Sequence, residues 1–327
     1  MSKAQICFAI VWTLSFGFLP TLDAQELKSF RISLSLGSAQ LPLWAARDAG
    51  LFAKNGLHVE LLGLQSASRQ VQLILAGDTL AASLSGTAPV RARIEGADTT
   101  IMMGLLNSFT LSVIAVPEIK KPSDLKGRFI GVGNLGGSPT LLTQRLLKKW
   151  GLESDVKFLA TGGYVESVAA LEKRRIHAAV LDPPRAYIGR KQFGFTELAN
   201  LGQEFKYATT VIVARESQLR KDRETFLQFA KGVIEGIHRV KTDREFSIKM
   251  LGKMLRSSDR EILGETYRVF SALYEKAPYP TLEGIQPILD EISTENPKAK
   301  NYKPENFVDT SIMKQLDQSG FVASVYR

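Results

Sequence analysis

The chain has 327 residues, 44% of them hydrophobic and 23% charged, which is typical of a globular protein with one large domain or two. Its formal charge of +9 comes from short basic clusters without interleaved aromatic residues, a pattern that argues against nucleic-acid binding. The single cysteine, Cys7, and three histidines without zinc-motif spacing argue against disulfides, thiolate chemistry and a metal site. We therefore expect no cofactor, no metal and no catalytic residues.

The N-terminal segment predicts export. Lys3 precedes the uncharged run "ICFAIVWTLSFGFL", which is followed by Pro20 and "TLDAQ". A membrane span needs about 20 apolar residues, so this run is short for an anchor. A basic start, an apolar run, a breaker and a small residue are the parts of a secretory signal peptide. We expect residues 1–24 to be removed after Ala24, with an uncleaved anchor as the alternative.

Strands and helices alternate in the next hundred residues. "FRISLSLGSAQ" alternates apolar and polar residues up to Gly37 and predicts a strand, and "LPLWAARDAGLFAKNG" predicts a helix that ends at Gly56. The alternation continues through "LHVELLGL", "SRQVQLILAGD", "TLAASLSG", "TAPVRARIEG" and "TTIMMGLL". This order predicts a mainly parallel sheet whose ligand-binding loops lie at the carboxyl ends of the strands.

A second block of the same kind follows "LSVIAVPE". It consists of "RFIGVG", "SPTLLTQRLLKKWG", "DVKFLAT", "YVESVAALEKRR" and "IHAAVLD", and "YATTVIVARE" then predicts a return strand. Beyond residue 218 the pattern is mainly helical. An apolar stripe at helical spacing, from Leu227 to Ile237, indicates packing against a core.

The glycines within residues 131–136 match the G-x-G-x-x-G spacing of dinucleotide-binding proteins. In such a fingerprint Pro139 would lie inside the helix, where a proline costs about 3 kcal/mol. The sequence instead predicts a helix with Ser138 as its N-cap and Gly151 after its end. The NAD interpretation is therefore rejected. A helix start of this kind favours an anionic or acceptor group of a ligand, and the alternative is that Ser138 only caps its own helix.

Several segments in this order resemble the nitrate/sulfonate/taurine-type periplasmic substrate-binding proteins of ABC transporters, which are related to the thiamine-pyrimidine (NMT1/THI5-like) proteins. They are "LPLWAARDAGLFAKNGLHVELL", "VQLILAGDTLAASLSGTAPV", "KKPSDLKGRFIGVGNLGGSPTLLTQRLLKKWGL", "VAALEKRRIHAAVLDPP" and "KYATTVIVARE". One departure is His177, where many members have Asp. The resemblance implies an α/β, two-lobed periplasmic binding protein of type II. Each lobe would be a mainly parallel sheet flanked by helices, and two crossing strands would join residues 25–116 and 212–327 (lobe I) to an inserted lobe II at 117–211.

The resemblance also implies where a ligand binds. The family's contacts fall on strand-end loops of both lobes. In lobe I they match Ser38, Gln40, Gln65, Ser66, Ser85, Gly86, Thr87, Asn107 and Ser108, and in lobe II they match Gly137, Ser138, Thr140, Tyr164 and Asp182. Asp182 either accepts a hydrogen bond from a ligand amine or anchors the following "DPP" turn, and both alternatives stay open.

The implied function is capture of a small organic anion, such as a sulfonate, a carboxylate or nitrate, by hinged closure of the lobes. The ligand would be delivered to a membrane ABC permease and its ATPase by a monomer in the periplasm. One alternative is a thiamine-pyrimidine precursor or other aromatic ligand stacked on Trp44, Phe109 or Tyr164. Another is a sensory receptor module of the same fold. An enzyme like the thiamine-pyrimidine synthase is disfavoured, because that group carries a cysteine-rich motif and the mature chain has no cysteine.

Overall fold

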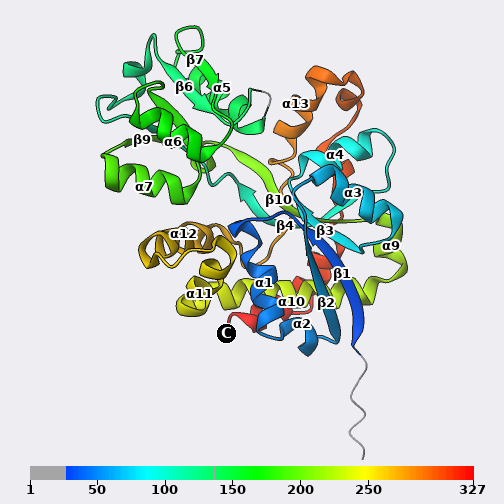
Figure 1. Cartoon of the computed structure of the whole chain (residues 1–327). Helices are drawn as coiled ribbons and strands as arrows, with labels where there is room; N and C mark the ends of the chain where they lie inside the picture. Colours follow the sequence, from blue (N-terminus) through cyan, green and yellow to red (C-terminus); the bar gives the residue numbers. More distant parts are fainter. Residues whose placement is uncertain (1–26, 136) are drawn as a thin grey trace, which may run out of the picture.

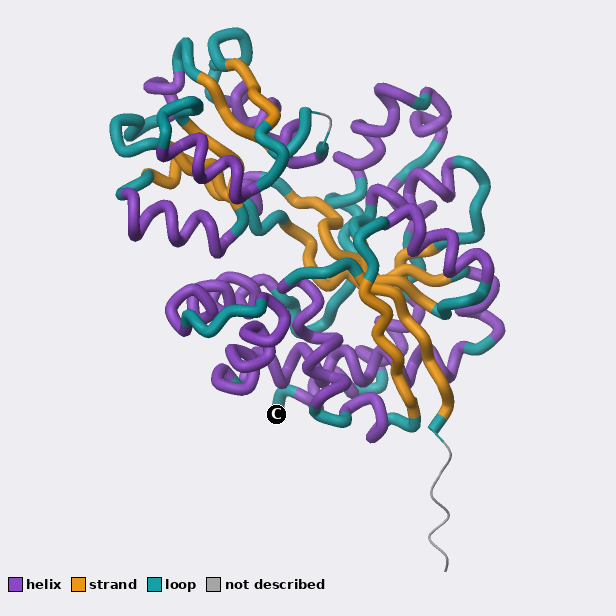
Figure 2. Tube along the Cα trace, in the orientation of Figure 1, coloured by secondary structure: helices purple, strands orange, loops and turns teal. Residues whose placement is uncertain are grey.

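The computed structural model describes residues 27–135 and 137–327, and these residues form two β-sheets covered by helices (Figures 1 and 2). The predicted signal peptide lies outside the described residues. We call the sheet that contains the first strand sheet A, and the other sheet B. Sheet A with its helices is lobe I, and sheet B with its helices is lobe II.

Sheet A has five strands in the order β2-β1-β3-β10-β4. Its strands are β1 (Lys28–Leu34), β2 (Leu57–Gly63), β3 (Ala81–Leu84), β4 (Thr100–Ser108) and β10 (Lys206–Ala214). Only β10 runs opposite to the others, because it pairs antiparallel with both β3 and β4. In β1 the apolar residues Phe30, Ile32 and Leu34 are fully buried, as the alternating pattern predicts.

Sheet B repeats this plan in the order β7-β6-β8-β5-β9. Its strands are β5 (Ser112–Ala115), β6 (Phe129–Val132), β7 (Lys157–Ala160), β8 (Ala178–Leu181) and β9 (Thr196–Asn200). Here β5 is the one strand that runs opposite to its neighbours. The predicted fold class, two lobes that each contain a mainly parallel sheet flanked by helices, is confirmed.

Helices cover both sheets. Lobe I has α1 (Leu41–Asp48), α2 (Leu51–Lys54), α3 (Ala67–Ala76), α4 (Thr87–Ile94), α9 (Glu216–Lys221), α10 (Arg223–Thr242), α11 (Arg244–Leu255), α12 (Arg260–Leu273), α13 (Gln286–Glu295), α14 (Ser311–Gln318) and α15 (Phe321–Val325). Lobe II has α5 (Ser138–Lys149), α6 (Tyr164–Glu172), α7 (Pro183–Phe193) and α8 (Leu201–Glu204). The helix expected between the first two strands is divided into α1 and α2 at Gly50, whose φ of 68° is left-handed.

The chain changes sheet twice, between residues 108 and 112 and between residues 200 and 206. The lobe boundaries expected from the sequence were 116/117 and 211/212. The first differs because β5 pairs with β8 and β9 of lobe II and is not a strand that crosses between lobes. The second differs because β10 joins sheet A from its first residue, Lys206, and pairs there again from Thr210 to Ala214.

Helix α10 is the centre of the lobe I core. Its Phe229 stacks on Phe30 of β1 at a centroid distance of 4.3 Å. Phe52 of α2 stacks on the Phe229 ring at 5.4 Å. Gly236 lets α1 approach closely, since a Cβ there would lie 2.4 Å from the carbonyl oxygen of Pro42. The stripe that begins at Leu227 is thus a packing surface, as its periodicity predicts.

Candidate ligand-binding site

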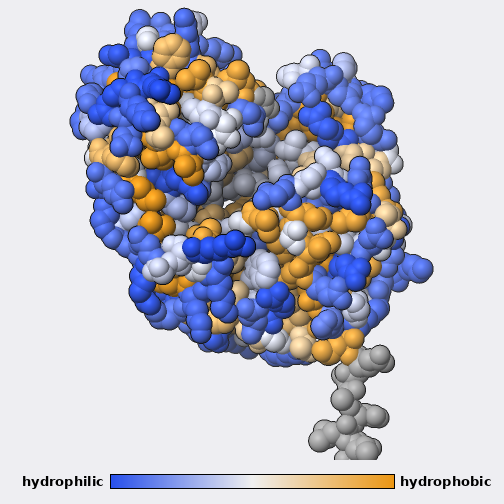
Figure 3. Space-filling view, viewed as in Figure 1, coloured by the Kyte–Doolittle hydropathy of each residue, from blue (hydrophilic) through white to orange (hydrophobic). Residues whose placement is uncertain are grey.

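The carboxyl ends of the parallel strands in the two sheets face each other. In sheet A, Ser108 at the end of β4 lies beside Lys206, where the returning chain enters the sheet. In sheet B, Leu181 at the end of β8 lies beside Ser112, where the outgoing chain enters. The strand-end loops of both lobes therefore border one interlobe cleft, and the molecular surface is hollowed between the lobes (Figure 3).

Some predicted residues of lobe I have mainly structural contacts. Gln40 is buried and accepts a hydrogen bond from Ser83 Oγ at 2.6 Å. The carbonyl oxygen of Ser38 accepts from the buried Tyr274 hydroxyl at 3.0 Å. Asn107 donates to the carbonyl oxygen of Tyr279 at 2.9 Å. These contacts hold the loops in place.

Other predicted residues of lobe I are more accessible. Gln65 and Ser66 are exposed, and Ser66 Oγ caps α3 by accepting from the Arg69 N–H at 3.2 Å. Ser85 and Thr87 are half-buried, with their hydroxyls 3.5 Å apart. Two further predicted positions are buried, Gly86 and Ser108. Gly86 is packed so closely on the returning strand that a Cβ would lie 2.8 Å from the carbonyl oxygen of residue 208.

In lobe II, the predicted residues Thr140 and Tyr164 line one pocket of about 240 Å³. Its other lining residues are Gly133, Asn134, Pro139, Gly162, Gly163 and Val180. Thr140 Oγ1 donates to the carbonyl oxygen of Asn134 at 2.6 Å and so fixes the glycine loop before α5. The pocket lies at the carboxyl ends of β6, β7 and β8, on the side of lobe II that faces lobe I.

Asp182 is an anchor for its own helix. It accepts from the Arg185 N–H at 3.3 Å as the N-cap of α7, and its Oδ2 pairs with Arg185 Nη1 at 2.6 Å. Burial raises the pKa of Asp182, although Arg185 opposes that rise. Burial also raises the pKa of Tyr164, which feels the charges of both residues. Arg185 therefore lies beside Asp182, directly after the carboxyl end of β8, and its guanidinium has further N–H donors besides the one paired with Asp182.

Ser138 is not the N-cap that the sequence predicted. Gly137 has the extended backbone of the cap position, with φ −86° and ψ 156°, and Ser138 is the first residue of α5. Both assignments allow a proline in the first turn, so the local pattern did not separate them. The Ser138 hydroxyl instead donates to the carboxylate of Glu291 on α13, in lobe I, at 3.1 Å.

Tyr207, at the start of β10, connects both lobes. Its hydroxyl lies 3.0 Å from Thr87 Oγ1, 2.7 Å from Ser138 Oγ and 3.2 Å from Glu291 Oε2. Its ring is 1% exposed and packs on Phe109 at a centroid distance of 4.7 Å. Burial raises the pKa of Tyr207 to about 12. Tyr207, Arg185 and Glu291 were not predicted from the sequence, and of these only Arg185 had a local signal, its spacing of three from Asp182.

Large apolar side chains are exposed just after strand ends in both lobes. Leu36 follows β1, Leu135 follows β6, and Val165 is in the first turn of α6, each on a loop or helix start at the carboxyl end of a strand. Their exposures are 57%, 56% and 61%, the highest of the large exposed hydrophobic residues in the described part of the chain. An apolar part of a ligand could be buried against them.

The rims of the cleft carry polar contacts between the lobes. On one side α7 contacts α12, where Lys191 pairs with Glu261 and Arg190 lies 3.4 Å from Glu265. On the other side, Arg145 of α5 and an aspartate of α13 are paired at 3.2 Å. In each ion pair lobe II supplies the cation and lobe I the carboxylate.

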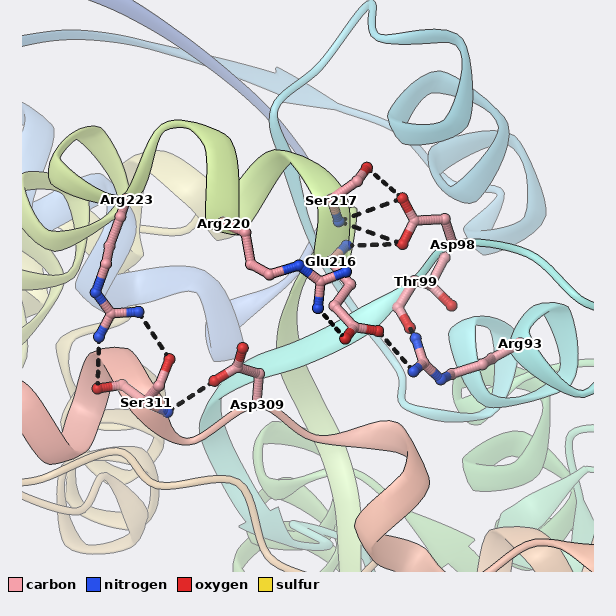
Figure 4. Close-up of polar contacts among 9 residues, drawn as sticks. All are labelled: Arg93, Asp98, Thr99, Glu216, Ser217, Arg220, Arg223, Asp309 and Ser311. Carbon is pink, nitrogen blue, oxygen red and sulfur yellow. Dashed lines mark hydrogen bonds and ion pairs between the residues drawn. The ribbon is translucent and has the colours of Figure 1, made fainter.

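A groove of about 560 Å³ lies elsewhere on lobe I and includes Arg93, Thr100 and Lys314. It is next to the start of β4, at the opposite end of sheet A from the cleft. Figure 4 shows its polar network, in which Arg93 pairs with Glu216 at 2.7 Å and Asp98 accepts from the N–H of Glu216 at 3.0 Å. These contacts hold α9 against α4 and leave the groove without a charge pattern that suggests a ligand.

Within residues 27–135 and 137–327, no three acidic, histidine or cysteine side chains are placed to hold a metal ion. The same part of the chain contains no helix with the length and apolarity needed to cross a membrane. His177, the departure from the family pattern, lies just before β8, at the end of sheet B away from the cleft, and its Nε2 is 3.4 Å from Arg128.

Two lobes of this topology, with loops facing each other across two chain crossings, define a two-lobed solute-binding fold. The chain is similar to the periplasmic aliphatic sulphonate-binding protein of Escherichia coli (TM-score 0.67, 16% identity, 86% of this chain and 98% of that chain covered). It is also similar to a putative periplasmic sulfonate-binding protein of Methylobacillus flagellatus (0.70, 16%, 91% and 97%) and to the periplasmic nitrate-binding protein of Synechocystis (0.61, 11%, 91% and 90%). At these identities the likeness shows the fold and not the ligand.

The family is shown by the sequence itself. The pattern of the "NMT1/THI5 like" family matches residues 38–245, more than half of the chain. The chain belongs to the NMT1/THI5-like family, as its resemblance predicted. No curated protein matches it.

Proposed function

We propose that this protein is the extracytoplasmic solute-binding component of an ABC import system. It would capture a small organic anion with one negative charge, such as a sulfonate or carboxylate, in the interlobe cleft. The family, the fold and the sulfonate- and nitrate-binding proteins of similar structure support the general role. The N-terminal segment, with the pattern of a signal peptide, supports export.

The observation that carries the ligand class is Arg185. The Arg185 guanidinium is held by its pairing with Asp182, and the Asp182 side chain, which follows β8 directly, is mostly buried. A guanidinium has five N–H donors, and the Asp182 carboxylate is bonded to one nitrogen of its fork. The remaining donors suit a carboxylate or sulfonate, whose charge-assisted hydrogen bonds are about twice as strong as neutral ones.

The apolar walls support a ligand with a hydrocarbon part in addition to its charged group. Leu36 of lobe I and Leu135 and Val165 of lobe II are exposed just after the carboxyl ends of strands, where the loops border the cleft. Closure around an alkyl chain would bury these side chains, and each buried methylene contributes about 0.8 kcal/mol. A bare inorganic anion would leave them in water.

An aromatic ligand is the second candidate, and Tyr164 is the observation that favours it. Of the three rings considered in the sequence, Phe109 is buried against Tyr207, and Trp44 is covered by the Arg47 guanidinium at 4.4 Å. Tyr164 is half-buried and lines the lobe II pocket, so it is the ring on which a ligand could stack.

The test is a thermal-shift screen of the mature protein against alkanesulfonates, alkanoates, nitrate and aminopyrimidines. A ligand at 100 times its Kd adds about 2.7 kcal/mol of stability, which is readily measured as an increase in Tm. We expect alkanesulfonates or alkanoates to raise the Tm, and small-angle scattering to show a smaller radius of gyration with them. A response to aminopyrimidines alone would favour the second candidate. Conversion of the ligand to a product would refute the binding role.

A further inference from the structure

A chain of hydroxyl groups runs through the hinge region and ends at Glu291. A carboxylate can only accept hydrogen bonds, so the Ser138 hydroxyl, 3.1 Å from Glu291 Oε2, must donate to it. Tyr207 Oη then donates to Ser138 Oγ at 2.7 Å, and Thr87 Oγ1 donates to Tyr207 Oη at 3.0 Å. Each hydroxyl therefore points its proton toward Glu291. Hydrogen bonds aligned in this way strengthen one another.

The carboxylate of Glu291 lies at the first residue of α5, where the positive end of a helix dipole favours negative charge. The neighbouring helix of lobe II is similar. Glu166 of α6 folds back over its own N-cap, Gly163, since a Cβ at that glycine would lie 2.5 Å from Glu166 Oε2. Two of the helix starts that border the cleft thus already have a carboxylate from the chain itself.

We propose that Glu291 is a specificity-determining residue that restricts the cleft to ligands with a single negative charge. This inference rests on the proposed function. The ligand's one anionic group is bound by Arg185, and a second anionic group that reached toward α5 would meet the fixed charge of Glu291. The start of α5 lies between the surroundings of Glu291 and the Tyr164 pocket. Ser138 lines a groove of about 280 Å³ between α5 and α13, together with Glu291. Pro139 and Thr140 line the Tyr164 pocket.

The size of the expected affinity difference between monoanions and dianions follows from the Coulomb repulsion of like charges in a partly desolvated cleft. At an effective dielectric constant near 20, two charges about 8 Å apart repel enough to weaken binding more than tenfold. Glu291 accepts from the Ser138 hydroxyl, which in turn accepts from Tyr207, and it is half-buried, so it cannot withdraw from a second anion without losing its bond to Ser138. A matched pair of ligands that differ by one charge should therefore bind with clearly different affinities.

The experiment compares 1-propanesulfonate with 1,3-propanedisulfonate, and butyrate with succinate, by calorimetry at low salt. We expect the wild type to bind the monoanion of at least one pair at least tenfold more tightly than the dianion. Glu291→Gln, which keeps the size of the side chain and one acceptor oxygen for Ser138, should bring the two affinities within about threefold of each other. Asp290→Asn is the matched control, since this neighbour on α13 pairs with Arg145 on the exposed rim, and it should leave the ratio unchanged.

Each outcome decides the matter. Equal binding of monoanion and dianion by the wild type overturns the inference even if Glu291→Gln does not fold. An unchanged ratio in a folded Glu291→Gln variant also overturns it, as does an equal change in Asp290→Asn. In these cases the proposed function stands, because a monoanion still binds. If the wild type binds none of the four probes, the proposed ligand class itself fails.

Discussion

The hydroxyl of Tyr207 offers the sharpest test of how the lobes are held together. Tyr207→Phe removes one oxygen and keeps the ring, which packs on Phe109, so no large cavity forms. The change deletes the contacts to Thr87, Ser138 and Glu291, at 3.0, 2.7 and 3.2 Å. Any effect therefore reports on the hydrogen bonds of this one oxygen.

The expected cost follows from those contacts. A neutral hydrogen bond contributes about 0.5–1.5 kcal/mol net, and one to a charged group about 1.5–3 kcal/mol. Ser138 and Glu291 keep their mutual bond at 3.1 Å, so part of the network survives. We expect Tyr207→Phe to lower the free energy of unfolding by about 2 kcal/mol. Two of the lost partners belong to lobe I and one to lobe II, so the radius of gyration should also increase.

The assay is urea unfolding at pH 7 with small-angle scattering on the same samples. Tyr326→Phe is the control, because burial raises the pKa of Tyr326 to about 12, as for Tyr207, but its hydroxyl has no partner among the described residues. We expect Tyr326→Phe to change stability by less than about 0.5 kcal/mol, because no intramolecular hydrogen bond is lost. Equal losses in the two variants would refute the role given to the Tyr207 network.

Arg185→Gln should weaken binding of monoanions at least tenfold in calorimetry, because a charge-assisted hydrogen bond is lost. Arg175→Gln, at an exposed position, is the control, and equal effects of the two variants would count against Arg185 as the counter-charge of the ligand. The free energy of binding of alkanesulfonates should become more favourable with chain length by up to about 0.8 kcal/mol per methylene. Leu135→Ser should reduce this increment, and an unchanged increment would contradict the contact between Leu135 and the alkyl chain. Partial burial, with Arg128 nearby, holds the pKa of His177 below its usual value. The unfolded chain then binds the extra proton more readily, so stability should be lost as the pH falls through about 6.5, and His177→Gln should flatten this dependence in thermal unfolding between pH 5 and 8.

Much of the fold was predictable because it depends on local patterns. The alternation in "FRISLSL" identifies β1, and the run of β-branched residues in "YATTVIV" identifies β10. The strand β5 was assigned to the wrong side of the lobe boundary, because the three apolar residues after Ser112 do not reveal which sheet they join. The sheet that a strand joins is decided by its pairing with strands far away in the sequence. The hydrophobic pattern of one strand does not indicate which strands those are.

The candidate site was predictable only in part. The strand ends from which these loops start were visible in the sequence, since the apolar strand patterns and the turns after them are local. The partner of Ser138 was not, because Glu291 is 153 residues away, in a helical region whose only local signal is an apolar stripe. The alternative that Asp182 anchors its own turn is the one the structure favours, through the cap and the pairing with Arg185. Local sequence identifies helix starts, whereas tertiary contacts decide what lies on them.

The distribution of charge explains why such a cleft would need its ligand in order to close firmly. The rim pairs, such as Lys191 with Glu261, match a cation of lobe II to a carboxylate of lobe I, so the lobes are complementary before any ligand binds. Exposed pairs of this kind contribute only about 0–1 kcal/mol each, less than is needed to fix one arrangement of the lobes. A ligand that bonds to Arg185 and buries Leu36 and Val165 gains free energy only when both walls reach it. A ligand shifts the equilibrium between open and closed lobes only by its difference in affinity for the two. Because the ion pairs at the rims are weak and apolar side chains of both lobes take part in binding, closure of this cleft would depend on the ligand.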